Sequence, residues 1–202
     1  MAMQQDPDLL TAAFALIGDE GWRGFSFSTL ARRTGVSRVE IYREFRGRGA
    51  LLSALSRRID EAMLAIDEAE LAGLPPRDRM FELLMRRFEA MVPYRAGLAR
   101  LAREARGDPC AALLTACRLD RSLALAQDLA GLRHHGLRAR LARRALGAAY
   151  LRALRVWFKD EAADLGQTMA ELDKQLRRVQ NVAGLREPRA RRRGAEEADQ
   201  PA

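Results

Sequence analysis

The balance of amino-acid types is the feature that most constrains the fold. The 202 residues include 36 Ala and 30 Leu, but only 15 Val, Ile and Thr together. Ala and Leu favour helix, whereas β-branched residues favour sheets. Hydrophobic residues make up 48% of the chain, which is enough to bury a core. We therefore expect an all-α protein of one or two domains and not a disordered chain.

Three short helices are expected in the first 45 residues, because capping residues and glycines bracket short apolar stripes. Their starts are predicted at Asp6-Pro7, Ser26 and Ser37, and their ends at Gly21, Gly35 and Phe45. In the third, Glu40 follows Ser37 by three residues, which is the Ser-x-x-Glu capping box. Ile41 and Phe45 form its inner face, and Gly47 and Gly49 mark its exit.

Longer helices are expected after residue 47. They are predicted over Arg48–Leu71, through Phe81, Leu84, Phe88 and Met91 to Pro93, over Arg95–Arg106, over residues 110–130, and at about residues 137–159 and 165–182. Their expected buried residues are Cys110, Leu114 and Cys117, then Gly147, Leu151, Leu154 and Phe158, and last Leu165, Met169, Leu172, Leu176 and Val179. Residues 186–202 hold five Arg, four acids and two Pro, so we predict a disordered tail there.

Positive charge is concentrated near the N-terminus. The net charge is +8, and residues 28–58 hold eight Arg against two Glu, whereas residues 1–27 hold one Arg and four acids. A basic segment suits a partner that carries phosphates or another anionic surface. Taken alone, the same segment could be an ordinary solvated face. Arg191, Arg192 and Arg193 allow the same two readings, and there a solubilising tail is preferred.

Residue usage argues against catalytic, redox and metal chemistry. Cys110 and Cys117 lie about 10 Å apart along one expected helix and cannot pair within it. His134 and His135 are adjacent, so they point in different directions on a helix. We find no nucleophile triad and no glycine-rich phosphate loop, and we expect a protein that is not an enzyme and needs no cofactor or metal. Without a secretory signal or an apolar span at its start, it is expected in the cytoplasm.

The most informative segment is residues 26–45, a short helix, a tight turn and a second short helix: SFSTLARRTGVSRVEIYREF. This arrangement can hold the second helix away from the body, so that its outer face enters a major groove while its inner face packs. Arg38 and Tyr42 lie one turn apart on that outer face, with Arg43 beside them. Arg38 lies in the first turn, where side chains and backbone N–H groups can meet phosphates or base edges.

The N-terminal quarter strongly resembles the TetR family of transcriptional repressors over about residues 8–55. The resemblance is carried by Gly21-Trp22, Leu30-Ala31, Gly35-Val36-Ser37, Ile41-Tyr42, Phe45, Arg48 and Leu51. It implies an N-terminal three-helix DNA-binding domain and a helical C-terminal domain that binds an inducer and dimerises. We place these domains at residues 6–50 and 51–185, ahead of the tail at 186–202. The predicted partners are a palindromic double-stranded operator, a small apolar ligand, and a second copy bound through residues 137–159 and 165–182.

The candidate DNA-contacting residues are Ser26, Thr29, Ser37, Arg38, Val39, Glu40, Tyr42, Arg43 and Arg48. By the resemblance, Tyr42 and Arg48 would contact phosphates, and Ser37, Arg38 and Arg43 bases or phosphates. Glu40 departs from the family, which usually has a small residue there. It could accept a hydrogen bond from a cytosine amino group, or it could only cap the helix. Glu44 also departs from the family and is expected to be solvated.

Two further expectations concern the C-terminal part. The candidate ligand pocket is lined by Phe81, Met85, Phe88, Met91, Tyr94 and Trp157, although each could simply belong to the core. Residues Trp157 to Val179 resemble, more faintly, the closing helices of the ubiquinone-biosynthesis accessory proteins, which share the TetR fold and bind lipids. The alternative function is therefore a lipid- or isoprenoid-binding accessory protein that binds no operator.

Overall fold

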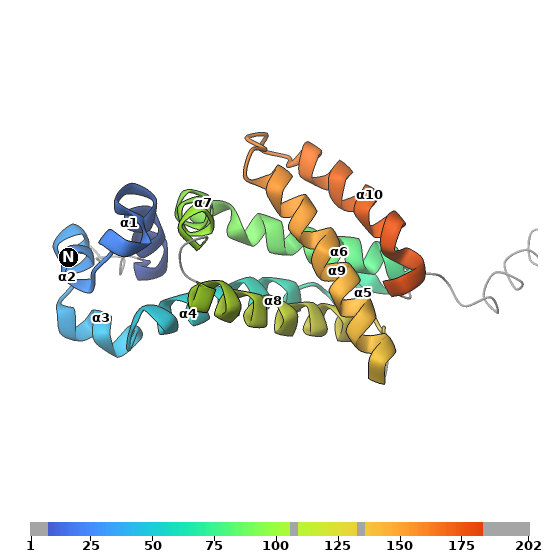
Figure 1. The fold of residues 1–202 in the computed structure, drawn as a ribbon, viewed down its shortest axis with the longest axis horizontal. Coiled ribbons are helices and arrows are strands. Elements are labelled where there is room, and N and C mark those ends of the chain that lie inside the picture. The colour runs from blue at the N-terminus through green and yellow to red at the C-terminus, as the bar shows by residue number, and fades with distance from the viewer. Residues whose placement is uncertain (1–7, 106–108, 133–135, 184–202) are drawn as a thin grey trace, which may run out of the picture. The chain divides into compact units, whose positions relative to one another are not determined.

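The computed structural model describes residues 8–105, 109–132 and 136–183, and all regular structure in these ranges is helical. Figure 1 shows the helices in chain order. They are α1 Leu9–Gly24, α2 Phe27–Thr34, α3 Arg38–Glu44, α4 Arg48–Leu64, α5 Glu68–Leu71, α6 Pro76–Met91, the 3-10 helix η1 Val92–Tyr94, α7 Arg95–Glu104, α8 Pro109–Leu129, α9 Gly136–Trp157 and α10 Gly166–Ala183. The expected all-α fold is confirmed. No helix in the described ranges combines the length and the apolar character needed to span a membrane.

The chain divides into two compact units. The N-terminal unit comprises Met1–Ala62 and Glu89–Leu119, and the C-terminal unit comprises Met63–Phe88 and Asp120–Ala202. The N-terminal unit therefore joins α1, α2, α3 and most of α4 to η1, α7 and the first half of α8. The predicted domain boundary near residue 50 does not coincide with the limit of this unit.

The core of the N-terminal unit is built from apolar residues of its first four helices and of the segment after residue 88. These core residues are all at most 5% exposed: Phe14, Ile17, Phe25, Leu30, Ile41, Leu51, Met91 and Tyr94. The ring of Tyr94 meets that of Phe14 edge-on, with centroids 5.5 Å apart. The Tyr94 hydroxyl accepts a hydrogen bond from Arg58 of α4 at 3.0 Å.

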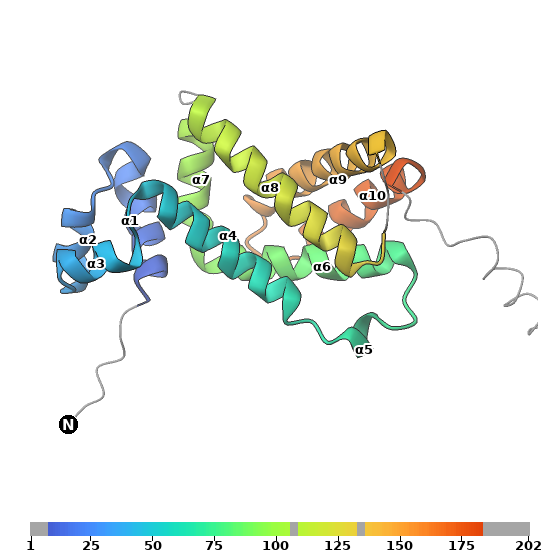
Figure 2. The same cartoon turned by 90° about the horizontal axis from the view of Figure 1, so that it is seen from below.

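Helix α7 packs closely along α1, and Figures 1 and 2 both draw the two helices side by side. A Cβ atom added at Gly97 would lie 2.3 Å from the carbonyl oxygen of Phe14. A Cβ atom added at Gly18 would lie 3.1 Å from the Cβ of Ala96. The absence of a side chain at Gly97 is therefore what lets α7 approach the backbone of α1.

The predicted start of α1 at Asp6-Pro7 is wrong. Asp8 is the N-cap, and its carboxylate accepts hydrogen bonds from the N–H groups of Leu10 and Thr11. Asp8 satisfies these N–H groups, which have no partner inside the helix, so the helix begins at Leu9. The predicted stop at Gly21 is a real break in backbone conformation, with φ 81° and ψ 166°, although helical hydrogen bonding resumes as far as Gly24.

The expected single helix from Arg48 to Leu71 is also wrong, because α4 ends at Leu64 and a separate helix α5 begins at Glu68. Asp67 caps α5 by accepting a hydrogen bond from the N–H of Ala69 at 3.0 Å. An apolar stripe that continues across the break cannot reveal this change of direction. Gly49, predicted to mark the exit from α3, lies inside α4.

In the C-terminal unit α9 and α10 pack along each other. The buried face of α9 is Ala142, Leu146, Ala149, Tyr150, Ala153 and Trp157. The predicted stripe is therefore offset by one residue: Leu151 is 46% exposed, and Gly147, Leu154 and Phe158 are only half-buried. Leu165, just before α10, and Leu172 and Leu176 on it are buried as expected, but Met169 is 39% exposed.

The turn before α10 is fixed by Asp160, which is fully buried. Its carboxylate accepts hydrogen bonds from the N–H of Thr168 at 2.8 Å and from the Thr168 hydroxyl at 2.7 Å. Elsewhere, Cys117 is exposed on α8 and not on its buried side as predicted. The side chains of Cys110 and Leu114 and the predicted tail, residues 186–202, lie outside the described residues.

Candidate nucleic-acid interface

The pair α2 and α3 is set by local hydrogen bonds that the sequence encodes. The Ser26 hydroxyl caps α2 by accepting from the N–H of Thr29 at 3.1 Å. Gly35 ends α2 in the left-handed conformation, with φ 74°, which glycine adopts without strain. Ser37 then caps α3 through the predicted capping box: the N–H of Glu40 donates to Ser37, and the N–H of Ser37 donates to Glu40. The predicted starts of both helices are confirmed.

Helix α3 turns one face to the core and leaves the opposite face open. Ile41 is fully buried, and Phe45 just after the helix is 2% exposed. Val39 is 60% exposed and Tyr42 61%, although both are large and hydrophobic. Arg38 and Arg43 are exposed as well. No other part of the described chain therefore covers the outer surface of α3, as the helix-turn-helix interpretation requires.

One flank of α3 forms a shallow hollow with α2. It is lined by Ser26, Ser28, Thr29, Ala31, Arg32, Val36, Ser37 and Arg38. Four of the nine predicted DNA-contacting residues thus meet at one place: Ser26, Thr29, Ser37 and Arg38. Sequence reasoning missed Arg32, whose guanidinium donates to Thr29 at 3.5 Å. Its position four residues after Ser28 on α2 was the available signal, because i and i+4 share a helix face.

The other flank of α3 is acidic. Glu40 and Glu44 line a second hollow together with Asp8, Arg57, Arg58 and Glu61. The two carboxylates of α3 are thus on the side away from Arg38. Hydrogen bonds from Ser37 lower the pKa of Glu40 below its ordinary value, since they favour the charged carboxylate. Of the two roles considered for Glu40, the structure shows the helix cap.

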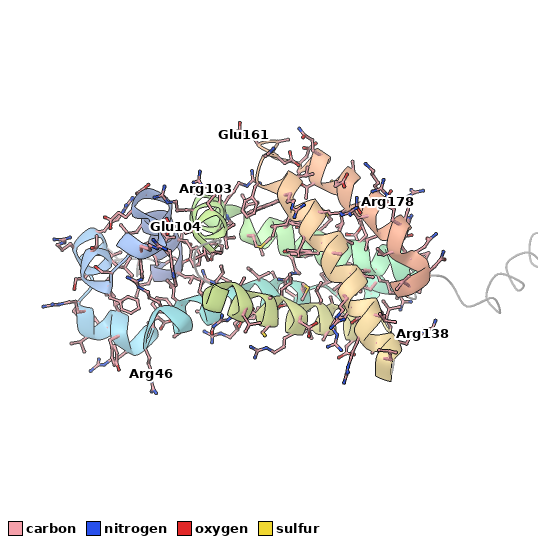
Figure 3. The ribbon with its side chains drawn as sticks, viewed as in Figure 1. Arg46, Arg103, Glu104, Arg138, Glu161 and Arg178 are labelled. Atoms are coloured by element: carbon pink, nitrogen blue, oxygen red, sulfur yellow. The ribbon has the colours of Figure 1, made fainter. Side chains whose placement is uncertain are left out.

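The arginines around α3 differ in what they contact. Arg33 is held by Asp19, with the guanidinium nitrogen 2.5 Å from the carboxylate oxygen. Arg38, Arg43 and Arg46 are exposed, and among the described residues none of them forms an ion pair. Figure 3 shows Arg46 extending away from the ribbon just after α3. These three guanidinium groups are available to an anionic partner.

Arg48 is the first residue of α4 and already has contacts within the chain. Its guanidinium donates to the carbonyl oxygens of Phe25 and Arg23, and it lies 5.6 Å from the centroid of the Trp22 ring. Arg48 therefore ties the start of α4 to the α1–α2 connection. The predicted phosphate contact of Arg48 stays a prediction, and the structure adds this second role.

The residues predicted to line a ligand pocket belong to both compact units, and the pocket stays a prediction. Met85, Phe88 and Trp157 are buried in the C-terminal unit, where Phe88 stacks on Tyr150 at 4.8 Å and lies 6.2 Å from Trp157. Met91 and Tyr94 are buried in the N-terminal unit, and Phe81 is half-buried. Sequence reasoning missed Tyr150 and the buried Arg87, whose guanidinium lies 5.5 Å from the Tyr150 ring. Within the described ranges no cluster of three His, Cys, Asp or Glu is placed to hold a metal ion.

The fold and this helix pair define a helix-turn-helix protein, and comparison with known proteins agrees. Residues 9–55 match the family model described as bacterial regulatory proteins, tetR family. Over this N-terminal segment the chain is therefore similar to the TetR family.

Solved structures show the same fold over most of the chain. A TetR transcriptional regulator from Nitrosomonas europaea ATCC 19718 is 24% identical, with a TM-score of 0.67; the match covers 83% of this chain and 93% of that one. A TetR transcriptional regulator from Rhodococcus sp. RHA1 is 18% identical, with a TM-score of 0.58, over 83% of this chain and 91% of that one. No curated protein sequence matches the chain.

Proposed function

We propose that the protein is a sequence-specific, ligand-responsive DNA-binding regulator, most simply a repressor, that acts as a homodimer in the cytoplasm and has no enzymatic activity. The observation that carries the proposal is α3: a capped helix with a buried inner face and an open outer face bearing Arg38, Val39, Tyr42 and Arg43. A helix of this kind can enter a major groove, where arginine reads guanine and apolar groups meet the thymine methyl.

In the proposed complex the Arg38 flank of α3 faces the DNA. The hydroxyl groups of Ser26, Thr29 and Ser37 line the α2–α3 hollow. Such groups can donate hydrogen bonds to phosphate oxygens and so fix the position of the protein on the duplex. Glu40 and Glu44 line the other hollow, on the acidic flank. Their carboxylates therefore do not repel DNA phosphates that bind at the Arg38 flank. Phosphate contacts supply most of the affinity in this arrangement, and α3 supplies the preference for sequence.

A homodimer through α9 and α10 is supported by the apolar side chains that these helices leave open. Leu137 is 71% exposed, Leu141 49% and Leu151 46% on α9, and Met169 is 39% exposed on α10. A second copy packed on this face would remove these side chains from water. Two recognition helices could then read half-sites one DNA turn apart, about 34–36 Å. A ligand in the C-terminal unit, near Phe81, Met85, Phe88 and Trp157, would act by shifting the spacing of the two helices.

Burial of side chains argues against the lipid-binding alternative. The segment that suggested it, Trp157 to Val179, contributes its tryptophan and its three leucines to the core of the C-terminal unit. Trp157, Leu172 and Leu176 are fully buried, and Leu165 is 3% exposed.

The direct test is selection of duplex DNA by the full chain from a random-sequence pool. We expect enrichment of an inverted repeat whose half-sites are about 10 base pairs apart, centre to centre. The same preparation should have a light-scattering mass of twice the 22.6 kDa of one chain. If no sequence is enriched, the proposed function is wrong; if the mass is that of one chain, the dimer is wrong.

A further inference from the structure

The α1–α2 connection, meaning residues 21–25 in the last turn of α1 and just after it, contains a backbone break that needs outside support. At Gly21 the chain leaves the helical conformation, so the N–H groups of Trp22 and Arg23 lose their partners in the preceding turn. Both donate instead to one oxygen of the Glu104 carboxylate, at 3.0 Å and 3.3 Å. Glu104 is the last residue of α7 and lies 81 and 82 positions away in sequence.

The position of Glu104 is unusual for an acidic residue. A carboxylate in the last turn of a helix is opposed by the helix dipole, which favours cations there. Arg100, one turn earlier, compensates by donating to the other Glu104 oxygen at 2.7 Å. Arg100 also lowers the pKa of Glu104, so the carboxylate stays charged. Figure 3 shows Glu104 on α7, with the neighbouring Arg103 extending away from the helix.

The carbonyl side of the same connection is held by a second charged residue. Arg48, the first residue of α4, donates to the carbonyl oxygens of Arg23 and Phe25 and lies over the Trp22 ring. The five-residue connection is therefore held by an anion on its N–H groups and by a cation on its carbonyl groups. Since Ser26, the cap of α2, follows directly, the position of this connection sets where α2 begins.

Two contacts fix α7 so that Glu104 can act as an anchor, and a third joins α8 to α4. The close approach at Gly97 sets the distance between α7 and α1. Tyr94, just before α7, accepts a hydrogen bond from Arg58 of α4. Arg118 of α8 donates to the Gly49 carbonyl at 3.2 Å and to the Ser53 hydroxyl at 3.1 Å, both on α4. All of these contacts lie within the N-terminal unit.

We propose that Glu104 is a positioning residue for DNA binding: it fixes the α1–α2 connection, and through it the register of α2 and α3, so residues 89–119 belong functionally with residues 9–55. The proposal rests on the proposed function. Glu104 touches no DNA. Removal of its side chain keeps all the residues that would contact phosphates. It lets α2 and α3 sample positions that do not fit the groove.

The experiment uses the full chain with two substitutions at this position and one control. Glu104→Ala removes both acceptor oxygens, and Glu104→Gln keeps one oxygen but not the charge. Glu161→Gln is the matched control, because Glu161 is exposed and lies in the connection before α10. The DNA probe is the duplex that the wild-type chain selects from a random pool. Amide hydrogen exchange of the peptide containing Trp22 and Arg23 is measured in the same preparations.

For Glu104→Ala we expect affinity for the selected duplex to fall on the order of tenfold. The slope of log Kd against log salt should not change, because no phosphate contact is lost. Exchange at Trp22 and Arg23 should be faster than in wild type, Glu104→Gln should be intermediate in both measurements, and Glu161→Gln should match wild type. A merely structural role would lower the melting temperature without lowering the affinity of the folded fraction.

Wild-type affinity and unchanged exchange in Glu104→Ala would overturn the proposal, and so would a loss of affinity fully accounted for by unfolded protein. If Glu104→Ala does not fold, Glu104→Gln decides, since wild-type affinity and exchange in that variant count against the proposal. A wild-type chain that selects no duplex contradicts the proposed function as well. That result is distinct from one in which wild type binds and the Glu104 variants bind equally well.

Discussion

The contact between α7 and α1 makes a stability prediction that depends on one missing side chain. Gly97→Ala would place a Cβ atom 2.3 Å from the Phe14 carbonyl oxygen, 2.9 Å from Phe14 Cδ1 and 3.0 Å from the Phe14 carbonyl carbon. The first and third of these atoms are backbone atoms, which cannot rotate away. The two helices must therefore separate, and Glu104 must move away from the α1–α2 connection with them.

The size of the effect follows from two opposing terms. Forcing an extra methyl group into a packed contact costs about 1–3 kcal/mol. Replacing glycine by alanine inside a helix returns up to about 1 kcal/mol. Because the clash is with backbone atoms, we expect a cost in the upper part of this range and a net loss of about 1–2 kcal/mol, or roughly 2–8 °C in melting temperature for a chain of this length.

The chain offers a matched control for this substitution. Gly49 lies inside α4, and an added Cβ would meet nothing within 4 Å. Gly49→Ala should therefore raise the stability by about 0.4–1 kcal/mol, since it only reduces the freedom of the unfolded chain. Chemical denaturation of the three proteins measures both differences. If Gly97→Ala is as stable as wild type while Gly49→Ala behaves as expected, the close approach of α7 to α1 is wrong.

Four other perturbations, at Ser37, Arg38, Leu151 and Glu104, have defined expected outcomes. Ser37→Ala should lower stability by about 1 kcal/mol in denaturation experiments, because it removes the cap of α3, and an unchanged midpoint would contradict the capping box. Arg38→Ala should weaken binding of the selected duplex and relax its sequence preference, whereas Arg103→Ala should do neither in a competition binding assay. Leu151→Glu should shift the light-scattering mass from two chains toward one, because it buries a charge in the proposed interface; a mass that stays at two chains argues for another interface. The lowered pKa of Glu104 means that its contribution to stability is complete above its ordinary value of 4.5 and is lost as the pH falls below it. The stability difference between wild type and Glu104→Gln should therefore shrink in denaturation curves recorded at decreasing pH, and a constant difference would count against this assignment.

Local signals in the sequence predicted the structure of the helix pair α2 and α3 well. The capping box of Ser37 and Glu40 and the left-handed turn at Gly35 depend only on residues within four positions of each other, so the sequence alone is enough to place them. The outer face of α3 follows from the same local geometry, because burial of Ile41 determines which side chains point outward.

Features that depend on distant residues were not predictable. The sequence predicts that Arg48 contacts a phosphate. Its hydrogen-bond partners, the carbonyl groups of Phe25 and Arg23, lie 23 and 25 positions earlier and are brought close only in the folded chain. Glu104 lies outside the helix-turn-helix segment, and nothing near it in sequence indicates a role there. On α9, the stripes containing Leu151 and Tyr150 both recur at helical spacing. Alanine and leucine occur on several sides of this helix, so only tertiary packing decides which stripe is buried.

The dependence of DNA affinity on salt tests the central claim most directly. If Arg38 and its neighbours meet a duplex through α3, log Kd for the selected fragment should vary linearly with log salt, with a magnitude of about 0.9 per neutralised phosphate. Arg38→Ala should change both the slope and the sequence preference, and Arg103→Ala neither. A salt-independent Kd, or equal slopes and preferences in wild type and Arg38→Ala, would contradict the assignment of α3 as the DNA-reading helix.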